Sequence, residues 1–300
     1  MRTIAAAVTL LLLALAQAHA HGEATHERAE WTLDPWILTP LLVSASLYAA
    51  GVFVLWRRAG WGRGIQPWQV AAYVFGWLAL TTALVSPLHW LGEHLFTFHM
   101  IEHEIVMVLA APLIAASRPL GALLWGLPKR FRIGMGLLLR TRLAAQLWRF
   151  LTRPVNAMVL HGVAIWIWHA PLLFDAAVTH DPVHRLQHLS FLLTALLFWW
   201  SLIRRADYGV ALGHLFVTML HTSVLGALMA LAPRVLYQVQ TADAPSWGLT
   251  PLEDQQLAGV MMWVPAGTVY AGAALAFAAL WISHSDKPIV SAGTIEERAR

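Results

Sequence analysis

The chain has 300 residues, of which 58% are hydrophobic and only 12% are charged. This composition excludes an ordinary soluble domain, and several long apolar runs indicate a polytopic membrane protein. Cysteine is absent, which excludes disulfides, thiolate metal sites and iron–sulfur clusters. The net charge of +4 does not indicate nucleic-acid binding, because the basic residues lie where membrane orientation requires them.

Residues 1–20 have the pattern of a secretory signal peptide, with a basic residue, an apolar core over Ile4–Ala16 and small residues after it. Cleavage is expected after Ala18 or after Ala20, and either product begins with a histidine. Residues 21–36 would then form a periplasmic leader that contains histidines. Short histidine-rich tracts can bind metal, but we favour a simple polar leader here.

Seven membrane spans are expected in the remaining chain from the length and spacing of its apolar runs. These spans are Ile37–Trp56, Trp68–Pro87, Leu95–Ala116, Val155–Phe174, His184–Ile203, Leu212–Ala232 and Asp254–Ile282. Together they predict an all-α membrane domain over residues 37–283. Residues 117–153, between the third and fourth spans, are basic and are expected to form an interfacial amphipathic helix.

Basic residues are unevenly divided between the two sides of this predicted domain. Sixteen Lys and Arg residues follow the first, third, fifth and seventh spans, and three lie in the segments on the other side. The positive-inside rule therefore places the mature N-terminus outside, and the segment 117–153 and the tail 284–300 in the cytoplasm. A signal peptide predicts the same orientation.

The segment His94–Met107 contains a dense group of ionisable residues, most of them inside a predicted span. His99 and His103 are four residues apart, so they lie about 40° apart on one face of a helix. Ionisable side chains are costly in a bilayer and are therefore candidates for a functional role. We expect these two histidines to be the central pair of metal ligands.

Other histidines are predicted to lie at a similar depth. At 1.5 Å per residue, His103, His169 and His188 fall roughly 6–12 Å below the outer ends of their spans. The predicted metal ligands of this layer are His99, His103, His169, His184 and His188. The predicted accessory residues are Glu102, Asp254, His94, His180 and Met262. Of these, the two carboxylates are expected to accept hydrogen bonds from imidazole N–H groups.

Imidazole ligands with an optional thioether and no thiolate suit copper best, followed by zinc and haem iron. Copper is therefore the expected metal, and haem is the less favoured cofactor. The other histidines in or beside the spans, His89, His161, His214 and His221, are interpreted as hydrogen-bonding groups between helices. A second site at His161 and His221, deeper in the membrane, stays open.

Residues 99–103 also match the H-x-x-E-H pattern of inverted zinc peptidases. Such a site needs a third protein ligand and an open position for water. No carboxylate follows in a later span before Asp254, which lies at the mouth of the last one. A hydrolase is therefore disfavoured, and we expect that the protein is not an enzyme.

Five motifs, in order along the chain, resemble those of the CtaG-type cytochrome c oxidase assembly factors of bacteria. They are His99-Met100-x-x-His103 with Ala111-Pro112, Trp168-His169-x-Pro171, His184-x-x-x-His188, Leu196-x-Phe198-Trp199-Trp200, and Glu253-Asp254-Gln255-Gln256 with Met262-Trp263. The resemblance covers about Ile37–Ile282 and departs at Ala258, where glycine is expected. It implies a multi-span protein of the bacterial inner membrane, surrounded by lipid, that helps to mature a haem–copper oxidase.

One function is expected from these observations, and three alternatives stay open. The expected protein holds copper in the outer-half histidine cluster and delivers it to an oxidase subunit. A haem-binding redox protein would use two imidazoles, such as His103 and His188, as axial ligands. A copper permease would need ligands through the whole bilayer, so His161, His214 and His221 would have to be functional. A scaffold would bind the oxidase without metal.

Overall fold

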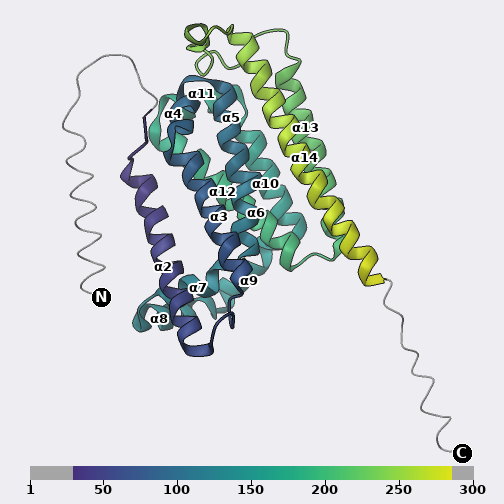
Figure 1. Ribbon diagram of the computed structural model, residues 1–300. Coiled ribbons are helices and arrows are strands. Elements are labelled where there is room, and N and C mark those ends of the chain that lie inside the picture. The colour runs from purple at the N-terminus through teal and green to yellow at the C-terminus, as the bar shows by residue number, and fades with distance from the viewer. Residues whose placement is uncertain (1–29, 286–300) are drawn as a thin grey trace, which may run out of the picture.

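The computed structural model describes residues 30–285, which form an all-helical bundle (Figure 1). No strand occurs within this range. Six helices are long and apolar enough to cross a membrane, and a seventh span results if a bent helix pair over residues 142–168 crosses as one. The prediction of an all-α polytopic membrane protein is therefore confirmed. The predicted signal peptide, the leader up to residue 29 and the tail from residue 286 lie outside the described residues.

The bundle consists of long helices joined by turns and shorter helices. The long elements are α2 (Pro35–Ala59), α3 (Pro67–Val85), the continuous run of α5 (Phe96–Glu104), η2 (Ile105–Ala110) and α6 (Ala111–Ala116), α10 (Pro154–Trp168), α12 (Asp181–Arg204), α13 (Tyr208–Ala230) and α14 (Pro251–Ser285). The short ones are α4 (Pro87–His94), α7 (Pro119–Gly126), α8 (Lys129–Leu139), α9 (Arg142–Leu151), α11 (Pro171–Thr179) and η3 (Ala244–Trp247). Helices α4 and α11 lie at one end of the bundle, and α7, α8 and α9 lie at the other (Figure 1).

The third span, from α5 to α6, is the central helix of the bundle. In its most apolar window 61% of the residues are buried, compared with 44% in α12 and fewer in the other long helices. The apolar core packs around it with large side chains such as Phe174, Phe191 and Tyr270. Its polar side chains are therefore held within the protein and kept away from lipid.

The fourth span is shorter than the predicted Val155–Phe174. Helix α10 ends at Trp168, and a new helix, α11, begins at Pro171. Proline has no N–H and disfavours helical geometry in the residue before it, and Ala170 is accordingly extended. The break leaves His169 at the end of α10 and turns α11 over the end of the bundle.

The basic segment 117–153 forms three helices, which differs from the single amphipathic helix that we expected. Pro128 and Thr141 precede α8 and α9, and the Thr141 hydroxyl accepts a bond from the backbone N–H of Ala144. No residue of α8 or α9 is buried, which is typical of helices at an interface. Helix α7 packs closely on α2, because a Cβ added to Gly51 would lie 1.8 Å from the Ala122 carbonyl oxygen.

Helices α13 and α14 lie side by side as an antiparallel pair (Figure 1). Their backbones meet at two glycines, since a Cβ on Gly259 would lie 2.6 Å from the Gly226 carbonyl oxygen and 2.5 Å from the Ala230 nitrogen. The neighbouring Ala258, where the motif predicts glycine, is fully buried in the apolar core. The close approach therefore depends on Gly259, and alanine is accommodated at the position before it.

Candidate metal centre

Three histidine side chains from α5 and α12 meet between these two helices. His99 and His103 project from successive turns of α5, and His188 comes from α12. One ligand nitrogen from each lies within 4.8 Å of those of the other two, and all three side chains are buried. The ring centroids are 4.4 Å apart between His99 and His103, and 4.9 Å apart between His103 and His188. We call His99, His103 and His188 the triad.

The triad contains buried ring nitrogens that have no hydrogen-bond partner within residues 30–285. His99 donates its Nδ1–H to the Gly92 carbonyl at 3.3 Å, so its unpartnered Nε2 keeps a lone pair. Both ring nitrogens of His103 are likewise without a partner in this range. An unsatisfied buried polar atom costs about 1–3 kcal/mol. A metal ion would satisfy these atoms, so the donor set fits one.

Two further predicted ligands flank the triad. His184, one turn before His188 on α12, places its Nε2 2.9 Å from the His188 Nε2. His169 lies on the other side, with its ring centroid 6.3 Å from that of His103. It donates its Nδ1–H to the Ile165 carbonyl at 2.7 Å, and its buried Nε2 has no partner in the described chain. The structure therefore gathers all five predicted histidines, three in the triad and two beside it.

Glu102 lies against the triad, as expected for an accessory carboxylate. Its fully buried Oε1 accepts a hydrogen bond from His89 Nδ1 at 2.8 Å and lies 3.5 Å from His188 Nδ1. Burial lowers the pKa of His89, but the carboxylates of Glu102 and Glu93 raise it by more, so this pKa lies above its usual value. His89 makes the interhelical bond that we predicted, and it also belongs to the site, which we did not predict. The sequence could have indicated that His89 belongs to the site, because His89, Glu93 and His94 form a polar run directly before the third span.

Asp254 holds a helix in place. Its carboxylate accepts bonds from the backbone N–H groups of Phe96 and Thr97 at 2.8 and 3.0 Å, and from the Thr97 hydroxyl at 2.7 Å. These are the free donors at the start of α5, where the N-cap residue itself offers no side-chain acceptor. Asp254 thus caps the helix that carries two of the triad histidines, whereas we expected it to accept from an imidazole.

The other accessory residues lie in three different places. His94 ends α4, donates its Nδ1–H to the Trp90 carbonyl at 2.8 Å and packs on the Trp90 ring. His180 is exposed at the start of α12. Met262 is buried in the apolar core on α14.

Histidines deeper in the bundle make hydrogen bonds to protein groups. His161 of α10 bonds to the Thr194 hydroxyl of α12 at 3.1 Å, and the Trp166 indole of α10 donates to His221 of α13 at 3.3 Å. These two contacts join helices, as we interpreted them. His214 instead donates to the Val210 carbonyl of its own helix.

A π-helical turn, η2, directly follows the segment with the two α5 histidines. The Ala111 N–H bonds to the Val106 carbonyl, five residues back, and Pro112 has no N–H to offer the next carbonyl. That carbonyl, of Met107, accepts a hydrogen bond from the Trp199 indole of α12 at 3.0 Å. The irregular turn is thus bonded to the helix that supplies His188.

This fold and site define a polytopic helical membrane protein with a buried imidazole cluster between its central helix and α12. The chain matches the family described as cytochrome c oxidase caa3 assembly factor (Caa3_CtaG) over residues 46–284. The protein belongs to this family, which confirms the resemblance that its motifs indicate.

The chain is also similar to mycobacterial proteins of unassigned function. The uncharacterized proteins Mb0105 of Mycobacterium bovis and MT0111 of Mycobacterium tuberculosis are each 29% identical to it over 248 residues. The matched region covers 78% of this chain and 36% of each relative, so the chain spans about a third of the length of the curated relatives it matches. No solved structure matches the chain.

Proposed function

We propose that this protein holds copper at the triad and delivers it to a subunit of a haem–copper oxidase. Membership of an oxidase assembly family supports a role in oxidase maturation. The observation that carries the copper assignment is the set of buried imidazole nitrogens without a protein partner among residues 30–285. Imidazole donors without thiolate suit copper best among the common metals.

Each residue near the triad has a distinct part in this proposal. The Gly92 carbonyl fixes the His99 ring by holding its Nδ1–H, and Glu102 holds His89 and lies beside His188. Such contacts set ring orientation and ligand basicity. His184 lies one turn nearer the end of α12 than His188, so it offers an exchange ligand on the way out of the site. Copper is cargo here, and a ligand that can be exchanged favours its release.

We place the protein in a bacterial inner membrane, with the triad in the outer half and the C-terminus in the cytoplasm. The unequal division of basic residues supports this orientation. Helices α4 and α11 contact His99 of the triad through the Gly92 carbonyl and the Phe174 ring, and they lie at the end of the bundle opposite the basic helices α7 to α9 (Figure 1). The client would receive copper from the outer side.

Copper analysis of purified full chain tests the proposal. We expect about one copper per chain, and its loss in the double variant His99→Ala with His103→Ala. A matched control is His284→Ala, because His284 is exposed near the far end of α14 and bonds to the Leu280 carbonyl of its own helix. Copper retained by a folded double variant would overturn the triad as the binding site.

The same samples separate the alternatives. An intense Soret band in the absorption spectrum would support haem ligation in place of copper. Copper uptake into vesicles that is lost on replacing His161, His214 and His221 would support a permease. Cells whose oxidase matures normally with the metal-free double variant would identify a scaffold.

A further inference from the structure

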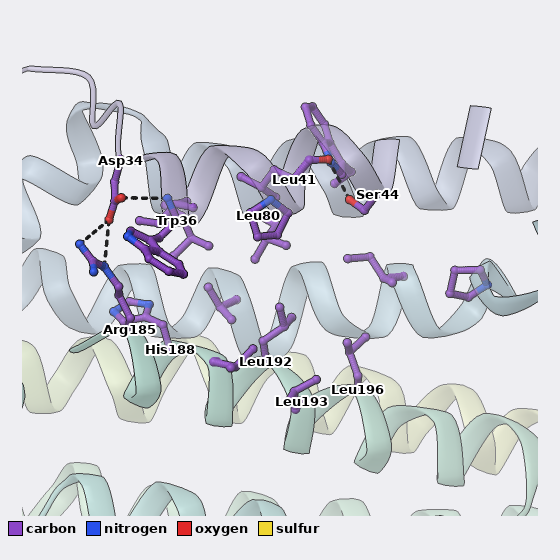
Figure 2. A pocket seen from close by; sticks show the side chains of 18 of the residues that line it. Asp34, Trp36, Leu41, Ser44, Leu80, Arg185, His188, Leu192, Leu193 and Leu196 are labelled. Carbon is purple, nitrogen blue, oxygen red and sulfur yellow. Dashed lines mark hydrogen bonds and ion pairs between the residues drawn. The ribbon is translucent and has the colours of Figure 1, made fainter. Parts of the chain in front are cut away.

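A long apolar groove runs beside the triad, between α2 and α12 (Figure 2). Its volume is about 1080 Å³. Helix α12 lines it from Asp181 to Trp200, which at 1.5 Å per residue is about 28 Å. That length approaches the roughly 30 Å thickness of the hydrocarbon core of a bilayer. The groove is therefore long enough for an extended chain that lies along the membrane normal.

The two ends of the groove differ in chemistry. Figure 2 shows Asp34, Arg185 and His188 together at one end and leucine side chains along the body. Arg185 bonds to Asp34 through Nη2 and Nε at 2.9 and 3.0 Å, which neutralises its charge. Glu93 and Asp181 also line the groove, so this polar end carries more carboxylates than cations.

The body of the groove is apolar and open along one side. Its α12 wall includes Leu189, Leu192, Leu193 and Leu196. Leu193 stays 51% exposed although it lines the groove, so a molecule in the surrounding bilayer can enter sideways. A polar end joined to a long apolar body fits an amphiphile with one polar head and an apolar tail.

Polarity and charge select among the amphiphiles and helices that a membrane offers. A transmembrane helix is apolar over about 20 residues, so it would set apolar side chains against the polar end formed by Asp34, Glu93 and Arg185. Because Asp34 and Arg185 are paired with each other, a phosphodiester head would face the carboxylates of Glu93 and Asp181. An uncharged polar head that forms hydrogen bonds with imidazoles suits the polar end and is not repelled by these carboxylates.

We propose that the groove binds an isoprenoid quinone or quinol, with its ring at the polar end and its tail along the α12 leucines. Quinone oxygens accept hydrogen bonds and quinol hydroxyls donate them, and the imidazoles of His184 and His188 offer both functions. His188 lines the groove and also belongs to the triad, so the ring would lie against the metal centre. This inference is independent of copper, because the groove exists without it.

Binding of decylubiquinone to the metal-free full chain in nanodiscs of zwitterionic lipid tests the inference. We expect one saturable site per chain in equilibrium dialysis. Leu193→Trp fills the body of the groove and should weaken binding at least tenfold. Leu228→Trp is the matched control, because Leu228 is 56% exposed on α13, outside the groove, and should leave binding unchanged.

Three outcomes would overturn the inference. They are the absence of saturable binding, equal binding by the two tryptophan variants, and a phospholipid, seen by native mass spectrometry, that decylubiquinone does not displace. Copper content and melting temperature of Leu193→Trp, compared with Leu228→Trp, show whether the fold is intact. A chain that binds the quinone but no copper would refute the proposed function and leave the groove assignment standing.

Discussion

At the scale of single residues, the triad is held by groups from neighbouring helices. The Gly92 carbonyl of α4 accepts from both His99 and the Gln240 side chain, at 3.3 and 2.8 Å. A Cβ at this position would lie 2.9 Å from Glu102 Oε2 and 3.3 Å from the His99 Cα, so any larger residue would press on both. Ring orientation at the triad therefore depends on residues that would never touch the metal.

The variant Glu102→Gln tests whether copper binding at the triad depends on a neighbouring residue that does not touch the metal. The amide keeps an oxygen for His89 but loses the negative charge beside His188, so we expect copper affinity to fall about 10–100-fold with little change in stability. Glu104→Gln is the matched control, since Glu104 is also buried on α5 and its Oε2 has no hydrogen-bond partner in the described chain. Chelator competition measures both affinities. Equal affinities for the two variants would show that Glu102 has no special part.

At the scale of elements, the π-helical turn joins the central helix to α12. Because Pro112 lacks an N–H, the Met107 carbonyl depends on the Trp199 indole for its hydrogen bond. This bond joins the central helix to α12, the two helices that supply the triad. It lies one helical turn after His103 along the central helix. Proline in a buried span is tolerated here because another helix satisfies the freed carbonyl.

Trp199→Phe should therefore destabilise the protein by about 1–3 kcal/mol, the cost of one unsatisfied buried carbonyl. The measurement is the melting temperature in detergent, with Trp200→Phe as the control on the neighbouring, less buried ring. Pro112→Ala restores a backbone N–H near the Met107 carbonyl. The loss caused by Trp199→Phe should consequently be smaller in a Pro112→Ala background, and an equal loss would contradict this account.

The contact between α13 and α14 gives a second test at this scale. Gly259→Ala would place its Cβ against backbone atoms of Gly226 and Ala230, which cannot rotate away, so the helices must separate. We expect a clear fall in melting temperature. Gly267→Ala, on the same helix, meets only the Ser223 hydroxyl at 4.0 Å and should be neutral or gain up to about 1 kcal/mol of helix propensity.

At the scale of the whole molecule, the two ends of the bundle have different characters. The triad contacts α4 through the Gly92 carbonyl and α11 through the Phe174 ring. These two helices lie at one end of the bundle and the basic helices α7 to α9 lie at the other (Figure 1). The proposed orientation places the first end outside the cell and the second in the cytoplasm. Delivery of copper to a client on the outer side depends on this orientation.

Cysteine labelling in intact cells tests the proposed membrane orientation. The chain has no native cysteine, so only the introduced thiol reacts. Ser246 is exposed in the short helix η3 before α14, and Gly134 has open space around it on α8, so each position accepts a cysteine. A membrane-impermeant maleimide should label Ser246→Cys alone, and Gly134→Cys only after lysis. Labelling of Gly134→Cys in intact cells would show that the orientation is opposite to the proposed one.

Some properties of this protein follow from local sequence pattern. Apolar length predicts most of the spans because a helix needs about 20 residues to cross a bilayer. The spacing of His99 and His103 predicts a shared face because helix periodicity is fixed. Depth along each span brings His169, His184 and His188 to the same layer, and the structure does gather them there. Membership of the assembly-factor family was also predictable from the motifs alone.

Other properties were decided only by tertiary structure, because the rotation and tilt of a helix do not follow from its own sequence. They determine that His188 joins the triad while His169 and His184 flank it. They bring Asp254 to the start of α5 across 157 residues of chain, where it bonds to Thr97. The groove likewise exists only because α2 and α12 stand apart. Contacts between distant segments depend on how helices pack, and packing is a property of the whole bundle.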